Sequence, residues 1–142
     1  MTVPMLLPRA LGTVMVTALV AGCSGGADKT AAEDGVRQFH DRYNAQQYHE
    51  IYADTAPEFR GATTEADLVT LLQNLRKRAG DLRTTNQTQW TINAGTGGSS
   101  VSLVYASAFE QISATERFLW QINAGKAVLA GYRIETPTLG SP

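Results

Sequence analysis

The spacing of apolar residues along the chain changes near Gly80. Before that point, apolar residues recur at helical intervals. Three helices are predicted, at residues 32–44, 48–54 and 65–78. The last is the most clearly marked, because Thr64 can cap its first turn and Gly80 can end it. Its expected apolar face consists of Leu68, Leu71, Leu72 and Leu75. The residues around Phe59 are expected to link the second helix to the third.

After Gly80, apolar and polar positions alternate, which is typical of strands with one buried face. Four strands are predicted, at residues 84–93, 101–109, 115–123 and 127–135. Short turns rich in Gly, Ser and Asn join them, so they should pair as an antiparallel meander. Helices followed by strands define an α+β domain, in which N-terminal helices pack on a curved antiparallel sheet of about four strands.

Residues 1–22 have the order of features of a secretory signal peptide. Arg9 precedes an apolar run at residues 10–20, which is shorter than the roughly 20 residues that span a membrane. The run ends in a Val-Ala-Gly-Cys sequence that resembles a bacterial lipobox. The resemblance implies cleavage before Cys23 and attachment of a diacylglycerol to its sulfur. An ordinary secretory signal followed by an unrelated cysteine is the alternative.

Two or three acyl chains anchor a protein stably in a bilayer. The mature protein is therefore expected to be a lipoprotein of a bacterial cell envelope, attached through Cys23. Ser24, which follows the cysteine, implies the outer membrane facing the periplasm if the host is Gram-negative. Residues 23–31 are small and polar and are expected to be the lipidated cysteine and a flexible tether. Residues 32–136 form the predicted domain, and residues 137–142 a tail.

Composition narrows the function only slightly. The 142 residues carry a net charge of −1, which indicates no nucleic-acid partner. A single cysteine excludes an internal disulfide bond. No spacing of Cys and His predicts a metal site, and no motif predicts another cofactor.

Three segments resemble the nuclear transport factor 2-like, or cystatin-like cone, superfamily. They are VRQFHDRYNAQQYHEIYADTAPEFRG at residues 36–61, the leucine-rich helix at residues 65–78, and ERFLWQINAGKAVLAGYRIE at residues 116–135. The nearest likeness is to uncharacterised bacterial lipoproteins. The resemblance implies a sheet that curls around the long helices and leaves a conical pocket. It does not imply an activity, because the superfamily includes isomerases, dehydratases, small-ligand binders and dimerisation modules.

An isomerase or dehydratase of that type would need a carboxylate or imidazole base inside the cone. The candidates are His40, Asp41, His49, Asp54 and Glu110. The two histidines are expected on solvent-facing sides of their helices, and Asp54 at a helix end. The strands are expected to bring no charged residue to the inner face of the sheet. The residues expected to line a pocket or bind a ligand are Tyr43, Tyr52, Asp54, Tyr105, Phe118, Trp120 and Tyr132.

Two surface features allow more than one interpretation. Small or apolar residues expected on the outer face of the sheet would permit a homodimer: Val104, Ala106, Ala108, Leu119 and Leu129. The basic run at residues 76–78 is interpreted as the solvated end of a helix whose dipole favours cations, with a lipid-headgroup patch as the alternative.

The function that the sequence favours is a lipid-anchored, non-enzymatic envelope lipoprotein whose domain binds a partner protein or a small apolar ligand. A small pocket enzyme of isomerase or dehydratase type and a structural dimerisation module are the alternatives.

Overall fold

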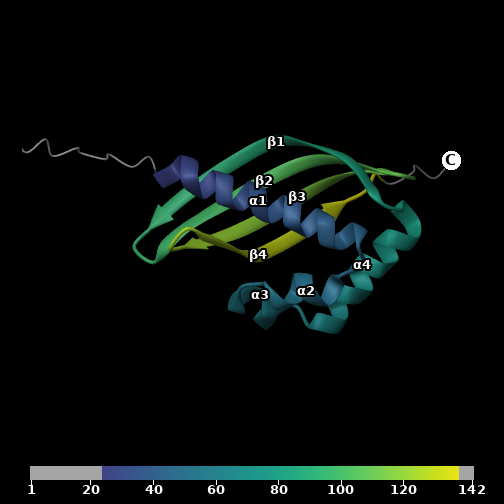
Figure 1. Cartoon of the computed structure of the whole chain (residues 1–142), viewed down its shortest axis with the longest axis horizontal. Helices are drawn as coiled ribbons and strands as arrows, with labels where there is room; N and C mark the ends of the chain where they lie inside the picture. The colour runs from purple at the N-terminus through teal and green to yellow at the C-terminus, as the bar shows by residue number, and fades with distance from the viewer. Residues whose placement is uncertain (1–23, 138–142) are drawn as a thin grey trace, which may run out of the picture.

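The computed structural model describes residues 24–137. The predicted signal peptide, the lipobox with Cys23 and all but the first residue of the predicted tail lie outside the described residues. Four helices come first: α1 (Ser24–Asn44), α2 (Tyr48–Ala53), α3 (Pro57–Ala62) and α4 (Glu65–Ala79). Four strands follow: β1 (Leu82–Gly95), β2 (Gly98–Phe109), β3 (Ser113–Asn123) and β4 (Lys126–Glu135). The predicted α+β class is confirmed (Figure 1).

The strands form one curved antiparallel sheet in the order β1-β2-β3-β4. Every pair of neighbours is consecutive in the chain, so the predicted meander is confirmed. Helix α1 lies lengthwise across the concave face and contacts all four strands (Figure 1). The shorter helices α2 and α3 lie beside β4, and α4 crosses the end of the sheet where β1 begins.

The core fills the space between α1 and the concave face of the sheet. Val36, Phe39 and Tyr43 form the predicted stripe on α1, and all three are buried. They meet inward-facing strand residues such as Leu103 and Phe118, which are also buried. Burial of this apolar surface is the main force that holds α1 on the sheet.

The segment expected to be a flexible tether is instead the beginning of α1, which starts at Ser24. Three contacts account for this difference. Ala32 is completely buried against the sheet, the hydroxyl of Ser99 donates a hydrogen bond to the Asp28 carboxylate, and Lys29 pairs with Glu33 one turn further on. Packing against the sheet therefore makes helical a sequence of small polar residues that would be marginal in isolation.

The ends of α4 agree with the prediction. The Thr64 side chain accepts a hydrogen bond from the backbone N–H of Asp67 at 3.1 Å. Gly80 follows the helix with a φ of 78°, a conformation that favours glycine. Three of the four leucines are buried, but Leu71 is 42% exposed because it lies at the margin of the apolar face. The segment around Phe59, expected to be a linker, is the short helix α3, with Pro57 in its first turn.

Arg76, the first residue of the basic run, connects the end of α4 to the end of α1, whereas Lys77 and Arg78 are exposed. Arg76 donates hydrogen bonds to the carbonyl oxygens of Tyr43 and Asn44, and it pairs with Asp81. Two of these interactions reach carbonyls where α1 ends: that of Tyr43 also accepts from the backbone N–H of Gln46, and that of Asn44 lies at the end of the helix, where carbonyls lose their intrahelical partners. Within residues 24–137, no helix combines the length and the apolar character needed to cross a membrane.

Candidate functional site

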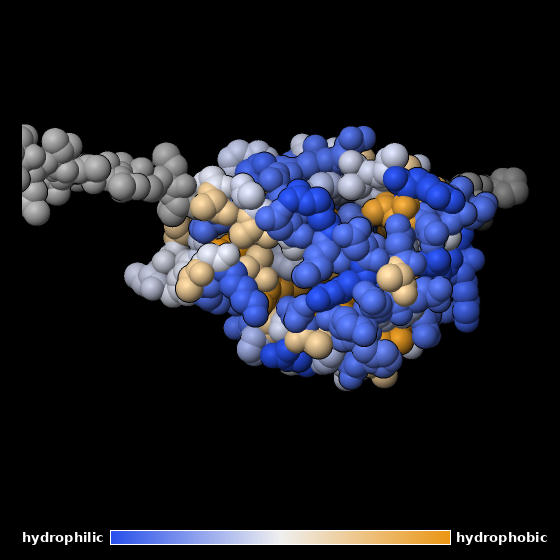
Figure 2. Space-filling view, in the orientation of Figure 1, coloured by the Kyte–Doolittle hydropathy of each residue, from blue (hydrophilic) through white to orange (hydrophobic). Residues whose placement is uncertain are grey.

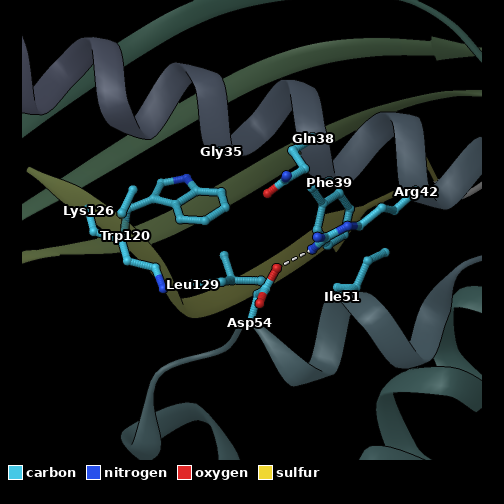
Figure 3. Close-up of a pocket in the computed structure, with 10 residues that line it drawn as sticks. Gly35, Gln38, Phe39, Arg42, Ile51, Asp54, Trp120, Lys126 and Leu129 are labelled. Atoms are coloured by element: carbon cyan, nitrogen blue, oxygen red, sulfur yellow. Dashed lines mark hydrogen bonds and ion pairs between the residues drawn. The ribbon is translucent and has the colours of Figure 1, made fainter.

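A pocket of about 240 Å³ opens between α1, α2 and the beginning of β4. Its apolar wall is formed by Phe39 from α1, Ile51 from α2, Trp120 from β3 and Leu129 from β4 (Figure 3). Figure 2 shows hydrophobic atoms at the bottom of the hollow between α1 and the shorter helices, with polar residues around them. The pocket can therefore enclose an apolar group while leaving a polar one in contact with water.

Three charged side chains lie at the rim. Arg42 donates a hydrogen bond to Asp54 at 2.5 Å, so these two charges largely compensate each other. Lys126 also lines the pocket and has no ion-pair partner within residues 24–137. The rim therefore has one more positive than negative charge. Because like charges repel and opposite charges attract, an anionic group is favoured there.

Trp120 can lie against α1 only because residue 35 is a glycine. A Cβ atom at Gly35 would be 2.8 Å from both Cη2 and Cζ3 of the Trp120 ring, which is too close for either group to remain in place. Trp120 is 5% exposed, and its indole Nε1 is buried without a hydrogen-bond partner within residues 24–137. The ring is thus held firmly as one wall of the pocket.

A second polar group is enclosed in the core. Glu116 on β3 is 1% exposed and accepts three hydrogen bonds: from His40 Nε2 at 2.8 Å, from Ser107 Oγ at 2.5 Å and from Tyr132 OH at 2.8 Å. The Thr85 hydroxyl lies 3.0 Å from that of Ser107. Phe39 packs against both His40 and Tyr132.

The surroundings of Glu116 determine its charge. Burial alone raises the pKa of this carboxyl, but the hydrogen bond and the charge of His40, together with the two hydroxyl donors, lower it below its usual value. Glu116 is therefore ionised at neutral pH, and because an ionised carboxylate has no hydrogen to donate, His40 Nε2 is the donor. Burial, followed by the charge of Glu116, raises the pKa of Tyr132. Burial raises the pKa of Tyr105 to about 12.

Two expectations about this cluster were wrong. His40 was expected to face solvent, but it is buried because it lies one turn after Val36, at the edge of the α1 stripe. The strands were expected to bring no charge to the inner face, yet Glu116 occupies the same face as Phe118 and Trp120. The sequence contained the information needed to place Glu116, because residues two apart on a strand share a face and Glu116 lies two residues before Phe118. Neither His40 nor Glu116 lines the pocket.

Of the seven residues expected to line a pocket, Asp54 and Trp120 do line this one. The other five lie outside it: Tyr43, Tyr52, Tyr105, Phe118 and Tyr132. Phe118 packs in the core, and all four tyrosine hydroxyls donate hydrogen bonds within the fold. That of Tyr43 reaches the Gly80 carbonyl at 2.9 Å, and that of Tyr52 the Thr63 carbonyl at 3.0 Å.

The remaining candidate bases lie outside the pocket. His49 is exposed, as predicted, and its Nδ1 is 2.6 Å from Glu65 Oε1. Asp41 is also exposed. Glu110 accepts a hydrogen bond from the backbone N–H of Asp81, which lowers the pKa of Glu110. The missed pocket residues, above all Arg42 and Lys126, carry no motif in the sequence and are brought together only by the fold.

The outer face of the sheet agrees with the prediction at four of five positions. Val104, Ala106, Ala108 and Leu119 lie on it, and Leu119 is 39% exposed. Leu129 was placed there wrongly: it is 2% exposed and faces the core. The reason is an irregularity where Leu119 pairs with Gly131 but Trp120 pairs with Leu129, which adds one residue to β4 and reverses the alternation.

No family model matches the sequence, and no curated protein matches it.

Proposed function

We propose that this chain is a lipid-anchored lipoprotein of a bacterial cell envelope whose domain binds a small ligand without transforming it. Membrane attachment is inferred from the lipobox that ends at Cys23. Ligand binding is inferred from the pocket beside Trp120, and this pocket is the observation that carries the proposal.

The ligand should combine a small apolar body with an anionic group. The apolar wall of Phe39, Ile51, Trp120 and Leu129 favours the first, and the excess positive charge at the rim favours the second. The volume of about 240 Å³ lies below the roughly 300–1,000 Å³ of sites for drug-sized molecules. A ligand with one ring or a short acyl chain therefore fits best.

Binding is favoured over catalysis because no base in the described domain is placed to act on a ligand in the pocket. Asp54 is the one carboxylate that lines it, and Arg42 holds that carboxylate in an ion pair. His40 and Glu116 bond to each other beneath Phe39 and do not reach the pocket surface. A general base needs direct hydrogen-bond contact with the proton that it removes.

The binding proposal can be tested by NMR on the purified lipidated protein in detergent micelles. The chain has two tryptophans, so two indole N–H signals report on two places: Trp120 in the pocket and the exposed Trp90 on β1. We expect 3-phenylpropionate to shift the Trp120 signal in a saturable way and to leave that of Trp90 unchanged. 3-Phenylpropan-1-ol, which has no charge, should bind more weakly.

A pair of matched variants provides the control. Ala127→Phe places a ring in the pocket and should abolish the shift, whereas Ala106→Phe on the outer sheet face should not. A chemically altered probe recovered after incubation would favour the enzyme alternative. No shift with either probe would exclude ligands of this class.

The anchor is tested separately by metabolic labelling with a clickable palmitate. Label should enter the wild-type protein and be lost in Cys23→Ala. A Cys23→Ala protein that still sediments with membranes would contradict the proposed anchor.

A further inference from the structure

The beginning of α1 and two turns of the sheet occupy the same end of the molecule. A hollow of about 270 Å³ is lined together by Asp28 of α1, by the β1–β2 turn and by the β3–β4 turn. Figure 1 shows the same arrangement, with both turns beside the first helical turn. The opposite end carries the end of α4 and the beginnings of β1 and β3.

Because α1 begins at Ser24, the residue that carries the proposed lipid directly precedes the folded domain. The Asp28–Ser99 hydrogen bond and the burial of Ala32 fix this part of the helix to the sheet. A helix rises about 1.5 Å per residue, so Asp28 lies only about 6 Å from the start of α1. The headgroup layer on each side of a bilayer is itself roughly 5–8 Å thick.

From this geometry we infer that the end formed by the β1–β2 and β3–β4 turns lies against the surface of the bilayer. The inference rests on the proposed lipid anchor at Cys23. It adds which face of the domain meets the membrane. It also adds that no free tether separates the lipid anchor from the domain.

The chemistry of this end suits contact with lipid headgroups. Residues 93–100 and 123–125, which form the two turns, contain no charged side chain. Two acidic side chains face the β1–β2 turn from neighbouring elements: Asp28 of α1, which accepts a hydrogen bond from Ser99, and Glu58 of α3. Lys126 adds a positive charge at the start of β4. Figure 2 shows a pale, weakly polar surface at this end and mostly strongly hydrophilic residues at the other.

Trp90 gives an independent indication. It is the most exposed large hydrophobic residue in the described domain, at 54%, and the Lys29 ammonium lies 5.6 Å from the centre of its ring. Lys29, which is also paired with Glu33, lies in the second turn of α1, and Trp90 lies on β1 five residues before the strand ends at Gly95. Tryptophan and lysine are side chains that favour the boundary between lipid and water.

The basic run at residues 76–78 does not compete for this role. It lies at the opposite end, where Arg76 is engaged by Asp81 and by two carbonyl oxygens. Strand β2 separates the two ends by about 35 Å, at roughly 3.3 Å per residue. A label at one end can therefore be distinguished from a label at the other.

The experiment uses the full lipidated protein with one added cysteine. Since Cys23 is the only cysteine and its sulfur would carry the lipid, Thr96→Cys in the β1–β2 turn supplies a single free thiol. Ser113→Cys at the start of β3 is the matched control, because both positions are exposed. Each protein is labelled with bimane and reconstituted in vesicles of phosphatidylcholine and phosphatidylglycerol, with and without brominated phosphatidylcholine.

We expect bromine to quench the label at position 96 at least about threefold more than the label at position 113, since the two ends are so far apart. Ala124→Cys in the β3–β4 turn provides a second label at the same end, should Thr96→Cys fold poorly. Equal quenching at the two ends, or stronger quenching at position 113, would overturn the inference.

The mass of the purified protein separates this result from the proposed function. A protein that carries the acyl chains but is not preferentially quenched at positions 96 and 124 is anchored in another orientation. A protein without acyl chains contradicts the anchor itself, and the inference falls with it.

Discussion

Replacing the buried Glu116 with glutamine should strongly lower the free energy of unfolding. The substitution keeps the size of the side chain and removes its charge. Glu116 accepts hydrogen bonds from His40, Ser107 and Tyr132. A hydrogen bond to a charged group contributes about 1.5–3 kcal/mol, against about 0.5–1.5 kcal/mol for a neutral one, so removal of the charge alone costs about 3 kcal/mol over three bonds. The amide nitrogen of glutamine cannot accept a hydrogen bond, so at least one of the three donors also loses its partner, which adds to that cost.

The effect should depend on pH in a defined direction. The pKa of Glu116 is lowered in the folded state, so its stabilising contribution is present above the pKa of an unfolded glutamate, about 4.3. That contribution is lost as the pH falls through the lowered pKa. The difference in unfolding free energy between wild type and Glu116→Gln should therefore be largest at neutral pH and should narrow below about pH 4.3.

Urea unfolding followed by circular dichroism measures this difference, and the chain supplies its own control. His49 and Glu65 form a second histidine–glutamate pair at 2.6 Å, but both side chains are exposed. Glu65→Gln should change the free energy of unfolding by no more than about 1 kcal/mol. If the two glutamine variants were equally stable at pH 7, the reasoning from burial and hydrogen bonding would be refuted.

Three other predictions follow from single contacts. Gly35→Ala should lower the free energy of unfolding by about 1 kcal/mol, because a clash of about 1–3 kcal/mol exceeds the gain of about 1 kcal/mol in helix propensity. In a Trp120→Phe background, where the ring is smaller, Gly35→Ala should instead raise the free energy of unfolding measured in urea. If Gly35→Ala lowered this free energy equally in both backgrounds, the proposed clash would be contradicted. Thr64→Ala should cost about 1 kcal/mol in the same assay through loss of the helix cap, and an unchanged midpoint would contradict that role. Arg42→Gln should weaken the NMR-measured binding of 3-phenylpropionate about fivefold, roughly 1 kcal/mol, with no such change for 3-phenylpropan-1-ol.

The sequence predicted the fold class and most elements because their signals are local. The α1 stripe, the Thr64 cap and the alternation in the strands depend on residues close together in the chain. The beginning of α1 could not be predicted in this way. Its residues are poor helix formers in isolation, and they become helical through contacts with Ser99 and the sheet, which are distant in sequence.

The candidate site was predicted only in part for a related reason. Trp120 and Asp54 were expected at a pocket, but Arg42 and Lys126 reach it from different elements and have no common pattern in the sequence. Leu129 was misplaced because a single extra residue in β4 reverses which side chains face inward. Glu116 is different, because its position two residues before Phe118 in the sequence already places both side chains on one face of the strand. Only its charge argued against a buried position.

The close approach of Gly35 and Trp120 has a consequence for the evolution of this domain. The Trp120 ring occupies the space that a side chain at position 35 would need, so a larger residue at position 35 lowers stability unless residue 120 is smaller. In relatives of this chain, a residue larger than glycine at position 35 should occur together with a residue smaller than tryptophan at position 120. Such paired substitutions would also change the depth of the pocket, because Trp120 forms one of its walls.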